Sequence, residues 1–143
     1  MAVKQLSVFV ENKPGSLARI AGALGEENIN IRALSVGEVG EYGIIRLIVD
    51  NPEKARDALK KRGYSVGLTD VLAVEMGDEP GSLANVTKIL GESDINIEYA
   101  YAFITRERNK ATLIARVNEL EKAEKILKDK GFRLIQAEEL YHM

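Results

Sequence analysis

Pro14-Gly15-Ser16-Leu17-Ala18 occurs a second time, letter for letter, as Pro80-Gly81-Ser82-Leu83-Ala84. The offset is 66 residues (80 minus 14), and it grows to 68 further along the chain. Three more pairs of segments extend the repeat: Leu24-Gly25-Glu26 with Leu90-Gly91-Glu92, Ile29-Asn30-Ile31 with Ile95-Asn96-Ile97, and Glu53-Lys54-Ala55 with Glu121-Lys122-Ala123. A fixed period of this kind indicates duplication of one structural unit. We therefore expect two domains, residues 1–70 and 71–143.

The overall composition restricts the classes of partner. The chain is 45% hydrophobic and 29% charged, as is typical of globular proteins. Its net charge of −2 argues against a protein that binds nucleic acid or anionic membranes through a basic surface. The sequence has neither a signal-peptide apolar region nor a run of about 18 apolar residues. We expect a cytoplasmic protein that does not bind nucleic acid or a membrane.

Hydrophobic periodicity and turn residues predict strand, helix, strand, strand, helix, strand in each repeat. In the first repeat the expected strands are 6–10, 30–36, 44–49 and 64–68, with helices from 16 to about 25 and from 50 to 63. In the second they are strands 71–76, 96–104, 110–117 and 132–139, with helices 82–92 and 119–130. This βαββαβ order is the ferredoxin-like pattern, with an antiparallel sheet and an α+β fold class. We expect the two sheets to join edge to edge as one eight-stranded sheet.

Catalytic chemistry has few candidate side chains. The chain contains no cysteine, and its one histidine, His142, is next to the C-terminus, where chains usually fray. Acidic residues occur mostly at the spacing of solvated helix surfaces, and neither a P-loop nor a Rossmann loop is present. We therefore expect no enzymatic activity, no metal and no cofactor.

The repeated Pro-Gly-Ser segment offers two interpretations. Free backbone N–H groups at a helix start, together with a glycine that allows close approach, can receive a carboxylate. The same residues can instead make only a tight strand-to-helix turn, with Ser16 as the helix cap. Asn30 and Asn96, each between two isoleucines, can either complete a turn or present an amide to a ligand.

Each repeat resembles an ACT domain, the small regulatory module of amino-acid metabolism. The resemblance rests on an acid or asparagine followed by x-Pro-Gly-Ser-Leu after the first strand, and on Ile-Asn-Ile at the second strand. The motif segments are Asn12-Lys13-Pro14-Gly15-Ser16-Leu17, Ile29-Asn30-Ile31, Asp78-Glu79-Pro80-Gly81-Ser82-Leu83 and Ile95-Asn96-Ile97. The chain looks like a stand-alone tandem ACT protein. Its first repeat is similar to the small regulatory subunit of acetolactate synthase.

The resemblance implies non-catalytic, allosteric binding of an amino acid between paired ACT units. Carried over to this sequence, the ligand-binding residues are Asn12, Lys13, Pro14, Gly15, Ser16, Leu17, Asn30 and Ile31 in the first repeat, and Asp78, Glu79, Pro80, Gly81, Ser82, Leu83, Asn96 and Ile97 in the second. The expected partners are an amino acid, a second copy of the chain in a homodimer, and an enzyme of amino-acid metabolism. The alternative is a structural module, or a regulatory subunit that binds no small ligand itself.

The two candidate sites differ in charge. Asn12 is replaced by Asp78 and Lys13 by Glu79 in the second repeat. We expect the first site to prefer acidic or neutral ligands and the second to prefer neutral or cationic ones.

Tyr99, Tyr101 and Phe103 alternate along one expected strand of the second repeat. Such an aromatic stripe is typical either of a core beneath helices or of a subunit contact.

Overall fold

The computed structural model describes residues 2–105 and 107–142. These residues form two compact units. The first unit contains Lys4–Thr69 with the C-terminal residues from Tyr141, and the second contains Asp70–Leu140 with the N-terminal residues up to Val3. The limits at 1–70 and 71–143, drawn from the repeat, stay our proposal for the domains.

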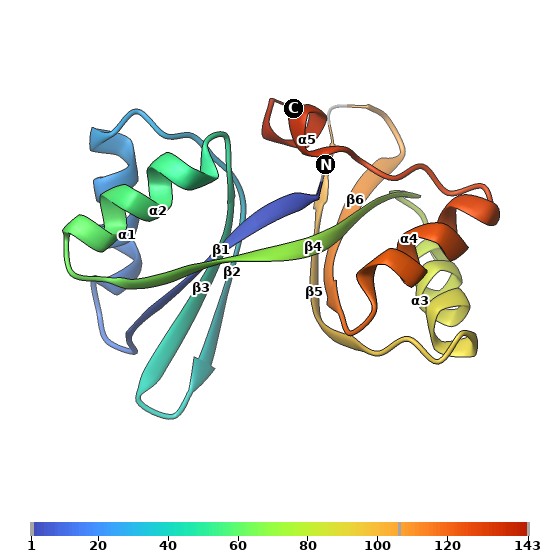
Figure 1. Cartoon of the computed structure of the whole chain (residues 1–143), viewed down its shortest axis with the longest axis horizontal. Coiled ribbons are helices and arrows are strands. Elements are labelled where there is room, and N and C mark those ends of the chain that lie inside the picture. The colour runs from blue at the N-terminus through green and yellow to red at the C-terminus, as the bar shows by residue number, and fades with distance from the viewer. Residues whose placement is uncertain (1, 106, 143) are drawn as a thin grey trace. The chain divides into compact units, whose positions relative to one another are not determined.

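The first unit has three strands of its own, two helices and the first part of a fourth strand. In chain order these are β1 (Val3–Glu11), α1 (Ser16–Glu26), β2 (Ile31–Val39), β3 (Tyr42–Val49), α2 (Pro52–Lys61) and β4 (Ser65–Gly77). The strand order is β2-β3-β1-β4, and β3 pairs antiparallel with both β1 and β2. Figure 1 shows α1 and α2 side by side. This is the βαββαβ arrangement predicted from the sequence.

The second unit continues from the same β4. Its further elements are α3 (Ser82–Glu92), β5 (Ile97–Ile104), β6 (Lys110–Val117), α4 (Leu120–Asp129) and a short α5 (Ala137–Tyr141). The strand order here is β4-β6-β5, and both neighbours of β6 are antiparallel to it. The helices α3 and α4 pack against each other as α1 and α2 do (Figure 1).

The two hydrophobic cores use repeat-equivalent positions. In the first core α1 supplies Ile20 and Leu24, and in the second α3 supplies Val86 and Leu90. The sheet and the second helix of each unit follow the same correspondence: Leu6, Val8, Ile45, Leu47, Ala55 and Leu59 correspond to Leu72, Val74, Leu113, Ala115, Ala123 and Leu127. The apolar residues are buried at the spacing that the sequence pattern predicts for one face of each helix and strand.

The expectation of an eight-stranded sheet was wrong, because the described residues form six strands. The strands expected at 64–68 and 71–76 are one strand, β4, since neither glycine nor proline interrupts the chain between them. The strand expected at 132–139 is reduced to one bridge, between Val74 and Leu134. From Ala137 on, good helix formers take the chain into α5 instead.

The aromatic stripe lies on the sheet face opposite α3 and α4. Tyr101 pairs with Ile114 and Phe103 with Thr112, and residues directly opposite in an antiparallel pair share a face. Leu113, next to both partners, belongs to the helix-covered core, so Ile114 and Thr112 point the other way. The stripe is therefore not a core beneath the helices.

Thr112 is a buried polar residue on that face. Its side chain is fully buried, and its Oγ1 has no hydrogen-bond partner among the described residues. A buried hydroxyl without a partner costs about 1–3 kcal/mol. Replacing Thr112 with valine, which has the same shape, should raise the free energy of unfolding by about 1 kcal/mol in urea denaturation.

The matched control is Thr87→Val in α3, where the hydroxyl donates to the Leu83 carbonyl at 2.9 Å. This substitution removes a satisfied group and should give no gain in stability. A loss of stability in Thr112→Val would contradict the expectation.

Candidate functional site

The loop between β1 and α1 is held by a hydrogen-bonded serine. Ser16 Oγ donates to the Glu11 carbonyl at 2.7 Å and accepts from Arg19 Nη2 at 3.2 Å. Ser16 is the first residue of α1, and the N-cap position belongs to Gly15, which makes no side-chain cap. The expectation that Ser16 caps the helix was therefore wrong: its buried hydroxyl fastens the loop to the end of β1.

Gly15 has a φ of +88°, in the left-handed region that favours glycine. The loop then turns directly into α1, whose first turn leaves the N–H groups of Leu17 and Ala18 without intrahelical partners. These groups stand at the positive end of the helix dipole. The backbone at this place can receive a carboxylate.

The side chain of Arg19 lies over this loop. A Cβ added at Gly15 would be only 3.0 Å from Arg19 Nη1. Lys13 lies on the loop as well, and its ammonium pairs with the Glu11 carboxylate at 3.0 Å. One guanidinium and one ion pair therefore surround the start of α1.

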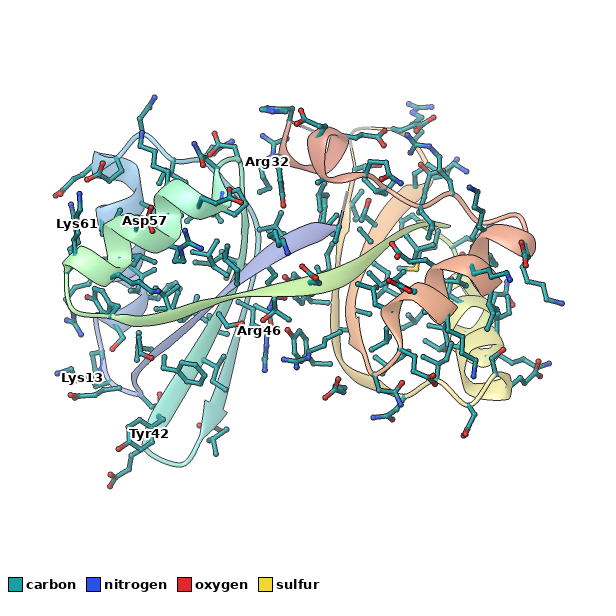
Figure 2. All side chains as sticks on the ribbon, viewed as in Figure 1. Lys13, Arg32, Tyr42, Arg46, Asp57 and Lys61 are labelled. Atoms are coloured by element: carbon teal, nitrogen blue, oxygen red, sulfur yellow. The ribbon has the colours of Figure 1, made fainter. Side chains whose placement is uncertain are left out.

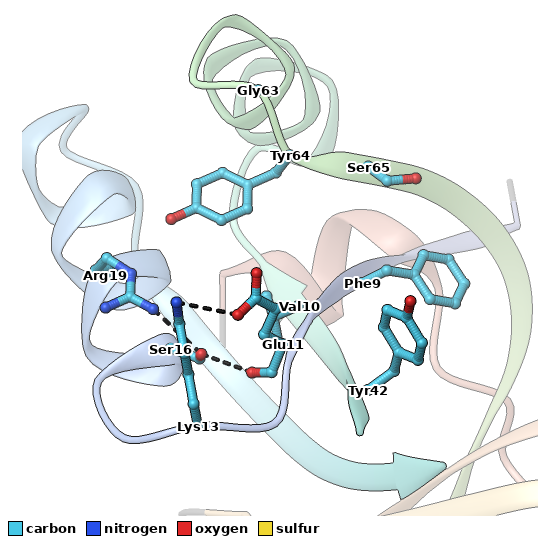
Figure 3. Close-up of a pocket in the computed structure, with 10 residues that line it drawn as sticks. All are labelled: Phe9, Val10, Glu11, Lys13, Ser16, Arg19, Tyr42, Gly63, Tyr64 and Ser65. Atoms are coloured by element: carbon cyan, nitrogen blue, oxygen red, sulfur yellow. Dashed lines mark hydrogen bonds and ion pairs between the residues drawn. The ribbon is translucent and has the colours of Figure 1, made fainter. Parts of the chain in front are cut away.

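A cavity of about 470 Å³ opens beside the loop. Figure 3 shows Tyr64 reaching toward Arg19 from the start of β4, with Phe9 and Tyr42 together on the other side of Glu11. The ten lining residues are Phe9, Val10, Glu11, Lys13, Ser16, Arg19, Tyr42, Gly63, Tyr64 and Ser65. In Figure 2, Lys13 is seen on the loop and Tyr42 at the hairpin between β2 and β3. A second hollow of about 370 Å³, between α1 and the segment that follows α2, shares Arg19 and Tyr64.

Of the residues predicted for the first site, the cavity brings together Lys13 and Ser16. Asn12 does not line it: its side-chain amide donates to Glu38 Oε2 at 3.2 Å and to the Gly40 carbonyl at 3.5 Å. Pro14, Gly15 and Leu17 are exposed on the loop without lining the cavity.

Asn30 and Ile31 lie at the other end of α1, where β2 begins. The helix between loop and asparagine has eleven residues, so it spans about 16 Å at about 1.5 Å per residue. The backbone N–H of Asn30 donates to Asp50 Oδ1 at 3.1 Å, and its side chain is exposed. The loop and the asparagine of this unit are therefore too far apart for one small ligand to touch both.

The second loop has the same backbone with different side chains. Gly81 has a φ of +89°, and the Ser82 N–H donates to the Glu79 carbonyl at 3.2 Å. The Glu79 carboxylate and the Ser82 hydroxyl both lie beside Gly77, where an added Cβ would be 3.1 Å from Ser82 Oγ and 3.3 Å from Glu79 Oε1. Negative charge thus faces this loop.

The remaining predicted residues of the second repeat are placed as in the first. Asp78, Pro80 and Leu83 are exposed around the loop. Asn96 is exposed at the entrance to β5. Its backbone N–H donates to Asn118 Oδ1 at 3.0 Å. Ile97 packs in part against the second core. Loop and asparagine are again at opposite ends of a helix, here α3.

Sequence reasoning missed Arg19 and the aromatic wall of Phe9, Tyr42 and Tyr64. For Arg19, Phe9 and Tyr42, the signal that could have found them is a difference between the repeats. The positions equivalent to Arg19, Phe9 and Tyr42 carry Asn85, Glu75 and Lys110.

Within residues 2–105 and 107–142, no group of three histidine, aspartate or glutamate side chains is placed to hold a metal ion. No helix in this part of the chain is both long and apolar enough to cross a membrane. His142 is exposed.

A family model described as an ACT domain pair matches residues 1–143. The chain belongs to the ACT domain family. A Bacteroides thetaiotaomicron protein of known crystal structure is 39% identical, with a TM-score of 0.93 over 100% of this chain and 98% of that one. The ligand-free regulatory subunit of aspartate kinase from Thermus thermophilus has the same fold, with 18% identity and a TM-score of 0.68 over 92% of this chain and 94% of that one.

Among curated proteins, this ACT pair matches a probable acetolactate synthase small subunit of Archaeoglobus fulgidus. The two are 36% identical over 59 residues, which is 40% of this chain. The aligned region covers 37% of the length of that subunit, so most of the subunit lies outside the match.

Proposed function

We propose that this ACT pair is a non-catalytic regulatory protein that binds an amino acid through its first Pro-Gly-Ser loop. The observation that carries the proposal is the cavity beside the start of α1, which is lined by Lys13, Ser16 and the Arg19 side chain. Cationic groups and helix-start N–H groups together favour a carboxylate.

The position of Asn30 supports a site completed by a second ACT unit, because loop and asparagine of one unit are separated by the length of α1. A ligand that bridges two units would favour the arrangement in which its site is complete, and this linkage would make the binding allosteric. We further propose a cytoplasmic homodimer that acts on an enzyme of amino-acid metabolism. The similarity to a probable acetolactate synthase small subunit supports that class of partner.

The competing function is an interaction module that binds no small ligand. The second loop favours it for the second unit, since Asp78 and Glu79 stand where the first loop has Asn12 and Lys13, and their negative charges oppose a carboxylate. In that case the second repeat would serve only to build interfaces.

A thermal-shift screen with the twenty amino acids tests the proposal. A ligand that binds only the native state stabilises it by RT ln(1 + [L]/Kd), or about 2.7 kcal/mol at a hundred times Kd. At least one amino acid should raise the melting temperature, and its amide derivative, which lacks the carboxylate, should not. If no amino acid raises it, the interaction module is the better account.

A further inference from the structure

The cavity of the first unit combines features that suit one class of amino acid. Resting on the proposed function, we propose that it selects an aromatic α-amino acid, and that each chain binds one such molecule, in the first unit. In this arrangement Arg19 holds the carboxylate, Glu11 receives the ammonium group, and Phe9, Tyr42 and Tyr64 surround the ring.

Arg19 is the group available for the carboxylate. Its guanidinium donates to the neutral Ser16 hydroxyl, and no carboxylate among the described residues pairs with it. Lys13, the other cation of the cavity, is already paired with Glu11. A guanidinium can bind a carboxylate with two parallel hydrogen bonds, which fixes the direction of the ligand as well as its charge.

Glu11 gives the cavity its negative charge. Its carboxylate lines the same space and is bound on one oxygen by the exposed Lys13. A carboxylate has about four acceptor positions, so Glu11 can accept from a ligand ammonium as well. Opposite charges at Arg19 and Glu11 match the zwitterion of an α-amino acid.

The remaining wall is aromatic and exposed. Phe9 is 50% exposed and Tyr42 is 64% exposed, although both are large apolar side chains. Tyr64 closes the cavity toward Arg19 (Figure 3). Aromatic rings favour offset or edge-to-face contact with another ring, so a ligand with an aromatic side chain gains more here than an aliphatic one.

The second unit has ion pairs where the first has this wall. Glu75, in the place of Phe9, pairs with Arg133 at 3.0 Å and with Lys110 at 3.8 Å. Lys110 and Arg133 occupy the places of Tyr42 and Ser65. Asn85 replaces Arg19, so the carboxylate partner is missing too. These charges occupy the places of Phe9 and Tyr42, whereas Phe132, in the place of Tyr64, packs against the second core.

Titration calorimetry of the full chain tests the inference with phenylalanine, tyrosine, leucine, aspartate and lysine. Phenylalanine or tyrosine should bind most tightly, with one molecule per chain. 3-Phenylpropionate lacks the ammonium group and 2-phenylethylamine lacks the carboxylate, so both should bind more weakly than phenylalanine.

Arg19→Asn introduces the residue of the second repeat and should weaken the binding of phenylalanine about 10- to 100-fold, as expected for the loss of a charged hydrogen-bonded contact. Phe9→Glu should also weaken it. The control is Arg56→Asn, which removes an arginine of α2 that pairs with Asp57 outside the cavity and should leave binding unchanged.

The outcomes separate the two proposals. Tight binding of a non-aromatic amino acid, two molecules per chain, or full affinity in Arg19→Asn would overturn this inference and leave the proposed function standing. If no amino acid binds at all, both are wrong.

Discussion

Replacing Leu90 with alanine should lower the free energy of unfolding by about 3 kcal/mol. Leu90 is on the inner face of α3 and is 0% exposed in the second core. Alanine at this position loses the buried methyl groups and leaves a cavity that the neighbouring sheet fills only in part. Urea denaturation, followed by circular dichroism, measures the difference.

The matched control is Leu83→Ala in the same helix. Leu83 is 51% exposed, so its removal creates no cavity and should change stability by less than about 0.5 kcal/mol. Equal losses in the two variants would contradict the expectation that the buried face of α3 contributes most of the difference, because alanine is the stronger helix former at both positions.

Gly15→Val and Gly81→Val should each cost about 1–3 kcal/mol of stability, because a β-branched residue is strained at positive φ. The two glycines have φ values of +88° and +89°, so the backbone strain should be the same. Their surroundings differ: a new Cβ at Gly15 meets Arg19 Nη1 at 3.0 Å, whereas at Gly81 nothing lies within 4 Å. Only Gly15→Val displaces the arginine of the cavity.

Calorimetry with the best-binding amino acid therefore distinguishes the two variants. Affinity should fall in Gly15→Val and stay unchanged in Gly81→Val, although both unfold more easily. Unchanged affinity in both variants would remove the first loop from the site. A loss in both would mean that the second loop binds ligand as well.

The sequence predicts the repeated part of the fold well because periodicity and turn chemistry are local properties. The helix from Ser16 and the strand through Ile44–Val49 follow from apolar spacing between strong turn residues. Leu134 shows where this fails, since the segment after α4 reads as a strand but pairs with Val74 through one bridge only. Pairing between distant segments is a tertiary property that local pattern does not contain.

The candidate site was predicted less completely than the fold. The motif located the loop and named Lys13 and Ser16, which line the cavity. It missed Arg19 because an arginine one turn into a helix looks like any solvated surface residue. It also missed Tyr64, 45 positions after Arg19 (64 minus 19), since only folding brings the start of β4 next to α1.

The continuous strand β4 also limits how this gene can change. Val66 and Leu68 pack against the first core, and Leu72, Val74 and Met76 pack against the second. All five are even-numbered, so one unbroken alternation of side chains serves both cores. A single inserted or deleted codon near Asp70 would turn the following side chains to the wrong face, whereas a change of two codons would keep them in phase. Related proteins should therefore differ in length at this boundary by an even number of residues.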